Sequence, residues 1–131
     1  MKTFIKKNEV PVTNFEWGAV GMRCEPLGTG CTTFVIMDVT LDPEGMHNFH
    51  KHVDQDEMIT VLSGKVVQWV DKEHQILEAG DSVYVARNTV HASFNEFTEP
   101  ATLQVVLGAT SGESGYELVD VAHAEPWLSI R

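Results

Sequence analysis

Two histidines separated by a single residue, His50 and His52, are the first residues in this sequence whose types and spacing could do chemistry. On a β-strand, side chains two residues apart leave the same face, so both imidazoles could reach one metal ion. Glu57 follows His52 by five residues and would face the other way on an unbroken strand. The polar segment 53–56 can supply a turn. We therefore expect Glu57 to begin a strand that runs antiparallel beside the strand of the two histidines.

A third histidine, His91, lies in a second polar cluster, residues 80–95. A Gly-Asp turn leads into SVYVA, and a turn at 87–89 precedes a strand that begins at His91. Alone, such a histidine is more often a core or surface residue than a ligand. Together with the first cluster, it suggests a set of three imidazoles and one carboxylate, which suits a transition-metal ion.

Short strands must position these residues. Apolar and β-branched runs, separated by turn residues, occupy 17–27, 32–41, 58–70, 82–86, 91–95 and 101–109. No segment has a sustained helical period, and the best helical candidate, 120–128, contains Pro126, which would end a helix early. The pattern predicts an all-β sandwich or barrel.

Composition sets further limits on the class of protein. The 131 residues fit one domain, 1–131, and the net charge of −10 with only nine Lys and Arg disfavours a nucleic-acid surface. The apolar runs are too short to cross a bilayer, and the N-terminus lacks a signal-peptide pattern, so we expect a cytoplasmic protein. Cys24 and Cys31 lack zinc-pair spacing and are expected to be free thiols.

The two polar clusters resemble the two sequence motifs of the cupin superfamily. In the first motif, residues 45–64, Gly45 precedes His50 and His52, four residues separate His52 from Glu57, and six more lead to Gly64. This departs from the family pattern by one residue in the spacing after Gly45.

The second motif, residues 80–95, also matches the family pattern closely. His91 and Asn95 have the family spacing, whereas Ala86 and Asn88 replace the usual Pro and Gly. Asn88 can still adopt the left-handed turn conformation that Gly normally provides. The resemblance implies a single-domain jelly-roll β-barrel, a homodimer in which the N-terminal strand often crosses to the partner, and one divalent metal ion.

The resemblance also implies the metal ligands, which are His50, His52, Glu57 and His91. Asp56 is an alternative carboxylate, but only Glu57 keeps the spacing to Gly64. This mixed nitrogen and oxygen set suits Fe, Mn, Ni, Co or Zn and disfavours Ca, which prefers oxygen ligands alone.

The residues outside the predicted ligand set are expected to have structural roles. His47 has the opposite strand parity from His50 and is expected at the exterior or rim. His74 and His123 are expected in solvent, and Asp54 is expected to be a turn residue. Counting by two from the ligands predicts pocket positions for Met46, Asn48, Ile59, Val61, Ser93 and Asn95. The expected core includes Phe34, Ile36, Trp69, Leu103, Val105 and Leu107. Weak candidates for substrate contacts are Asn48, Gln68, Tyr84, Arg87 and Gln104.

Three classes of function are compatible with this sequence. A complete ligand set favours a metal-dependent enzyme acting on a small chelating substrate, with a dioxygenase-type oxidoreductase preferred. A non-redox lyase, isomerase or decarboxylase is the alternative, because three His and one Glu occur in cupins of both kinds. The second alternative is a small-ligand binding or sensing cupin without catalysis. The sequence itself assigns no catalytic residue beyond the metal centre.

Overall fold

The computed structural model describes all 131 residues, and its strands form two antiparallel sheets. Sheet A has the order β1-β2-β3-β10-β5-β8, and sheet B has the order β11-β4-β9-β6-β7. The strands of sheet A are β1 (Val12–Phe15), β2 (Gly18–Cys24), β3 (Phe34–Leu41), β10 (Ala101–Gly108), β5 (Asp56–Ser63) and β8 (Ser82–Val85). Those of sheet B are β11 (Val119–Asp120), β4 (Met46–Lys51), β9 (His91–Phe94), β6 (Lys65–Val70) and β7 (Glu73–Glu78). The all-β prediction is confirmed, although no strand pairing closes the two sheets into a barrel.

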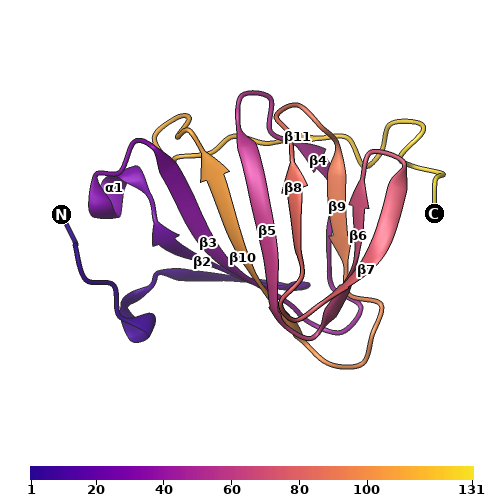
Figure 1. Cartoon of the computed structure of the whole chain (residues 1–131), viewed down its shortest axis with the longest axis horizontal. Coiled ribbons are helices and arrows are strands. Elements are labelled where there is room, and N and C mark those ends of the chain that lie inside the picture. The colour runs from indigo at the N-terminus through magenta and orange to yellow at the C-terminus, as the bar shows by residue number, and fades with distance from the viewer.

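Helical structure is confined to two short pieces near the N-terminus, a 3-10 turn η1 (Lys7–Glu9) and a single turn α1 (Pro26–Thr29). The carboxylate of Glu25 caps α1 by accepting from the N–H of Leu27, and Gly30 ends it in the left-handed conformation. Beyond the end of β11, residues 122–129 form turns and a bend, so the helical candidate 120–128 is not a helix. None of the helices has the length and apolar character needed to span a membrane. Figure 1 shows the two termini at opposite ends of the molecule.

The main hydrophobic core lies between the two sheets. Strands β3 and β10 pair over their whole length and alternate buried with partly exposed residues, as expected for strands with one face in the core. Leu103, Val105 and Leu107 are buried there as predicted, together with Val66 from sheet B. Phe34 was expected in this core, but it is 38% exposed because it begins β3 with its side chain outside the alternating buried set.

A second hydrophobic cluster covers the opposite face of sheet B. It contains Phe49, Trp69, Ala92 and Phe94, and Trp127 and Ile130 of the C-terminal segment pack against it. Trp69 is therefore buried, but outside the space between the sheets where it was expected, because Val66 and Gln68 take the inward positions of β6. The C-terminal segment thus covers the back of the sheet that carries His50 and His91.

Backbone hydrogen bonds connect the two sequence motifs directly. The Asn95 N–H donates to the carbonyl of Gly45, and the Glu44 N–H donates to the carbonyl of Asn95. At the other end, the Asn88 N–H donates to the carbonyl of His52, and Asn88 has the predicted left-handed conformation with φ of 62°. The second motif therefore fixes the backbone of the first at its start and at His52.

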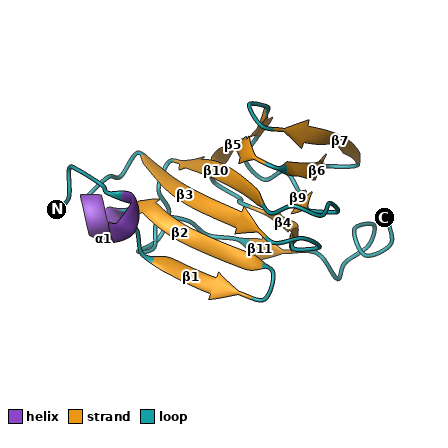
Figure 2. Cartoon of the chain, turned by 90° about the horizontal axis from the view of Figure 1, so that it is seen from below, coloured by secondary structure: helices purple, strands orange, loops and turns teal.

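Strand β1 forms the outer edge of sheet A, as Figure 2 shows. All four of its residues are exposed, including Val12 and Phe15. A partner strand could pair with this free edge. The homodimer stays a prediction.

Gly64 joins β5 to β6 with φ of +75°, and a Cβ there would lie 2.5 Å from the Pro100 carbonyl oxygen. We expect Gly64→Ala to lower the free energy of unfolding by roughly 2–4 kcal/mol, because it combines left-handed backbone strain with this clash. Gly80→Ala is the matched control, since Gly80 has φ of +94° but open space around its Cβ position. It should cost only about 1–2 kcal/mol. Urea unfolding measures both changes, and equal losses would contradict the steric argument.

Candidate metal centre

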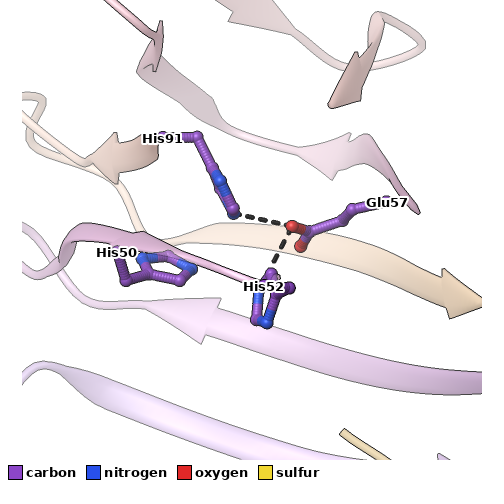
Figure 3. A group of neighbouring side chains, drawn as sticks. All are labelled: His50, His52, Glu57 and His91. Atoms are coloured by element: carbon purple, nitrogen blue, oxygen red, sulfur yellow. Dashed lines mark ion pairs between the residues drawn. The ribbon is translucent and has the colours of Figure 1, made fainter. Parts of the chain in front are cut away.

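The four predicted ligands converge between the sheets. The side chains of His50, His52, Glu57 and His91 point toward one another in Figure 3, and each residue is at least 95% buried. One ligand atom from each lies within 4.8 Å of the other three. Two ligands on opposite sides of an ion with bonds of about 2.1 Å are roughly 4.2 Å apart, so this cluster has the dimensions of a site for one ion.

The elements that supply these side chains differ in part from those expected. His50 and His91 are register partners on β4 and β9, and His52 follows directly after β4. Glu57, however, belongs to β5, which pairs with β10 and β8 in the other sheet. The prediction that Glu57 lies on a strand beside β4 is wrong, because residues 53–56 carry the chain across to the opposite sheet instead of forming a hairpin. The carboxylate therefore reaches the imidazoles across the core.

The alternative carboxylate, Asp56, points away from the site. Its Oδ1 accepts from the backbone N–H and the Nε of Arg87 at 2.9 Å and 3.3 Å. These hydrogen bonds to Arg87 lower the pKa of Asp56. Both side chains are exposed, so Arg87 is engaged on the surface rather than aimed at a substrate.

Backbone carbonyl groups fix the orientation of all three imidazoles. The Nδ1 atoms of His50 and His52 lie 2.7 Å from the carbonyl oxygens of Asn48 and Glu117, and Nδ1 of His91 lies 3.0 Å from that of Thr89. A carbonyl oxygen can only accept, so each Nδ1 carries a hydrogen. The neutral imidazole then has its lone pair on Nε2, directed into the cluster, which is the arrangement that metal-binding histidines adopt.

The inward-facing atoms lack satisfactory partners of their own. Oε1 of Glu57 lies 2.6 Å from Nε2 of His91 and 3.4 Å from Nε2 of His52 (dashed lines in Figure 3). Even so, Glu57 Oε1, His50 Nε2 and His91 Nε2 are buried without a hydrogen bond of suitable geometry. Buried polar atoms are rarely left unpaired, so their convergence fits a site that a metal ion completes.

Burial and charge act against each other in the Glu57–His91 pair. Burial alone would raise the pKa of Glu57, but the nearby imidazoles of His52 and His91 bring it below the usual range. Burial alone would lower the pKa of His91, and contact with Glu57 raises it above its ordinary value. Without an ion, the pair therefore favours a carboxylate beside a protonated imidazole. For His50, by contrast, burial lowers the pKa well below its ordinary value.

His47 lies at the rim of the site, as expected, but its ring faces the cluster rather than the exterior. Between His47 and His50, β4 advances three residues while β9 advances only two, from Ser93 to His91. This β-bulge reverses the parity count, so the His47 ring stacks on the His50 ring at 3.9 Å between centroids instead of facing outward. Burial lowers the pKa of His47 to about 4. The same bulge leaves Met46 42% exposed.

Trp17 and Phe15 continue this stack toward the surface. The Trp17 ring lies nearly parallel to the His47 ring with 5.8 Å between centroids, and Phe15 stacks on Trp17 at 5.0 Å. A hollow of about 490 Å³ is lined by Trp17, Met46, His47 and Asn48, among others. The hollow adjoins the stacked rings at the edge of the site.

Comparison with known proteins assigns the family. The model of the cupin domain family matches residues 37–107, which is more than half of the chain. The chain belongs to the cupin family.

Individual relatives of this cupin are more distant. The uncharacterized protein YdbB of Bacillus subtilis is 40% identical over 48 residues, which are 36% of this chain and 42% of YdbB. Among solved structures, oxalate decarboxylase of Lactobacillus farciminis has a TM-score of 0.76 at 20% identity, covering 88% of this chain and 35% of its own. KdgF from Halomonas sp. has a TM-score of 0.70 at 15% identity, covering 82% and 94%. At these identities the structural likeness shows the fold alone.

Gln55 is the residue of this cupin whose role the sequence analysis missed. Segment 53–56 was assigned only as a turn, but Gln55 is 2% exposed and its amide donates to the carbonyls of Ala109 and Gly115. Its Oε1 accepts from the N–H of Glu117, whose carbonyl in turn holds His52. An amide side chain between His52 and Glu57 was the only signal of this role in the sequence.

The other candidates for pocket positions or substrate contacts are hydrogen-bonded within the fold or exposed on the surface. Ser93 donates to Gln68 in a buried pair at 2.6 Å, and the Asn95 amide donates to the carbonyls of Leu41 and Glu99. Tyr84 is 58% exposed. The surface predictions for His74 and His123 are confirmed, and the His74 ring stacks on Trp69 outside the site.

We expect Gln55→Ala to weaken metal binding by roughly 10- to 100-fold, because the carbonyl that orients His52 loses its support. The free energy of unfolding should fall by about 1–3 kcal/mol, since buried backbone groups lose their partners. Titration with a divalent ion and urea unfolding measure the two effects. Asp54→Ala, in the same turn but exposed, is the control. Unchanged metal affinity in the Gln55 variant would contradict the positioning role.

Metal affinity should increase with pH. Below the raised pKa of His91, an incoming ion must displace the proton held beside Glu57, so binding releases a proton and is weaker. Above that pKa the competition disappears. Calorimetric titrations with Mn²⁺, repeated from pH 5.5 to 8.5 in buffers of different ionisation enthalpy, give both affinity and proton release. An affinity independent of pH over this range would be inconsistent with the ion pair.

Proposed function

We propose that this cupin is a mononuclear metal enzyme that acts on a small organic substrate able to chelate the ion, in a dioxygenase-type oxidation. The supporting observation is the set of three oriented imidazoles and one carboxylate with inward atoms that lack hydrogen bonds. Four protein ligands leave one or two positions free on a six-coordinate ion. When bound, the ion would supply Lewis acidity and, for a redox-active metal, electron transfer with dioxygen.

The roles of the protein residues follow from their positions. His50, His52 and His91 would bind the ion through Nε2, and Glu57 would bind through its carboxylate. The donor set fits Fe, Mn, Ni, Co or Zn. Burial of all four side chains excludes bulk water and strengthens electrostatic interactions within the site.

Charge around the site favours a neutral or singly charged substrate. No Lys or Arg is among the buried residues, and Glu57 offsets one charge of a divalent ion. A dianionic substrate would therefore lack the counter-charge that its desolvation requires. The hollow beside Trp17 and His47, of about 490 Å³, has the size of small-molecule sites and offers a flat ring for stacking. These features favour an organic chelator such as an enolisable diketone over a dicarboxylate.

A non-redox lyase, isomerase or decarboxylase is the second candidate. Its support is the similarity in fold to a protein named oxalate decarboxylase, which is 20% identical to this chain over the aligned region, 35% of that protein. The same buried donor set could polarise a carbonyl group without redox chemistry.

Metal analysis and an oxygen-dependence assay test the proposal together. Wild-type protein should contain about one transition-metal ion per chain, and His91→Ala should lose the ion and at least 100-fold of the activity. His74→Ala, which alters an exposed ring outside the site, should lose neither. Substrate panels of 1,3-diketones, flavonols, thiols and 2-oxo acids are assayed in air and under nitrogen, with oxygen uptake recorded.

Each alternative gives a different result in these assays. Turnover that persists under nitrogen would reject the dioxygenase and support the second candidate. Binding without turnover across the panel would support a sensing cupin. A protein that purifies empty and has an unchanged melting temperature with Fe, Mn, Ni, Co or Zn would reject the metal site itself.

A further inference from the structure

The two cysteines lie at either end of the single helical turn α1. Cys24 ends β2 and is buried, whereas Cys31 follows Gly30 and is partly exposed. The turn closes through backbone hydrogen bonds from Thr29 to Glu25 and from Gly30 to Pro26. In Figure 1, α1 lies at the end of the molecule beside β2 and β3. The helical turn therefore brings the two ends of segment 24–31 back toward each other.

The hydroxyl group of Thr29 contacts both cysteines. Its Oγ1 lies 3.2 Å from Sγ of Cys24 and accepts from the backbone N–H of Cys31 at 3.2 Å, while it donates to the carbonyl of Glu25. After the backbone groups of Phe34 and Thr33, the Cys24 side chain is a further cause that lowers the pKa of the Cys31 thiol. The Thr29 hydroxyl therefore links the Cys24 thiol to the backbone of Cys31 across α1.

Cys31 is the more reactive of the two thiols. The backbone N–H groups of Phe34 and then Thr33 point at its sulfur and lower the pKa of the thiol. Stabilised thiolates that solvent can reach are the ones that react with oxidants. Cys24 is only 8% exposed, and both cysteines contact Thr29, so Cys24 is the candidate to resolve an oxidised Cys31.

We propose that Cys24 and Cys31 form a dithiol site that a hydroperoxide oxidises to an intramolecular disulfide. The Cys31 thiolate attacks one peroxide oxygen, the O–O bond breaks, and water or an alcohol leaves after taking up a proton. The Cys24 thiol then attacks the resulting sulfenic sulfur, the S–O bond breaks and a second water leaves. Two thiols are oxidised by two electrons and one hydroperoxide is reduced by two.

The position of α1 connects this dithiol to the metal centre. Gly115 lies so close to α1 that a Cβ on it would be 2.8 Å from Cδ of Pro26. The Gly115 carbonyl accepts from Gln55, and the neighbouring Glu117 carbonyl accepts from Nδ1 of His52. A disulfide across α1 therefore changes the surface against which the loop that orients His52 packs. This second part rests on the proposed metal site.

The dithiol is tested first on metal-free, fully reduced protein with one equivalent of hydrogen peroxide. Wild-type protein should lose both thiols to alkylation, lose two hydrogens in mass and recover after dithiothreitol. Trypsin should release residues 24–51 as one peptide that contains the bond. Cys24→Ser should stop at a sulfenic acid that dimedone traps, and Cys31→Ser should react at least ten-fold more slowly.

Three results would overturn the dithiol: a remaining alkylatable thiol in the wild type, disulfide-linked dimers, or equal rates for the two serine variants.

For the connection to the metal centre, Mn²⁺ binding is compared between the reduced and oxidised forms, because Mn²⁺ has little affinity for thiolates. We expect at least a three-fold change in dissociation constant, and equal constants would overturn the connection. Absence of Mn²⁺ binding in the reduced form would count against the metal site, while the mass measurement judges the dithiol independently.

Discussion

Three hydrogen bonds from imidazole Nδ1 groups to backbone carbonyls are the interactions on which the candidate site depends. The carbonyls of Asn48, Thr89 and Glu117 leave each ring only one orientation in which its Nδ1 hydrogen is satisfied. The three Nε2 atoms are thereby directed to one point before any ion arrives. Such preorganisation reduces the entropy lost on binding, because the rings do not need to search for their orientation.

These three carbonyls belong to different parts of the chain, which are held in place by different contacts. Asn48 lies on β4 and Thr89 in the turn before β9, so both are fixed by sheet B and the second motif. Glu117 lies in the segment between β10 and β11, which is attached through Gln55. Glu57 comes from the facing sheet. The donor set consequently depends on correct packing of the two sheets and one loop, and no single strand or hairpin could assemble it.

The spacing of residues predicted which residues form the cluster. It predicted only in part which strands and sheets carry them. His50, His52, Glu57 and His91 converge because their motif positions determine how far each lies from a turn. Strand parity did not predict that the His47 ring faces His50, because a β-bulge inserts a residue that strand periodicity cannot show. It also failed to place β5 in the opposite sheet, since a four-residue connection is compatible with a hairpin or a crossing. The role of Gln55 depends on contacts with residues 54 to 62 positions away, and that of the cysteine pair depends on the local helical turn. Spacing alone encodes neither.

The stack of rings from Phe15 through Trp17 and His47 to His50 gives this protein an intrinsic optical reporter. Trp17 is one of three tryptophans, and the other two pack against the back of sheet B, away from the cluster. Only the Trp17 indole stacks on His47, whose ring in turn stacks on His50 of the site. Light emission from this one indole is therefore sensitive to what His50 binds, and the occupancy of the centre can be followed without any attached dye.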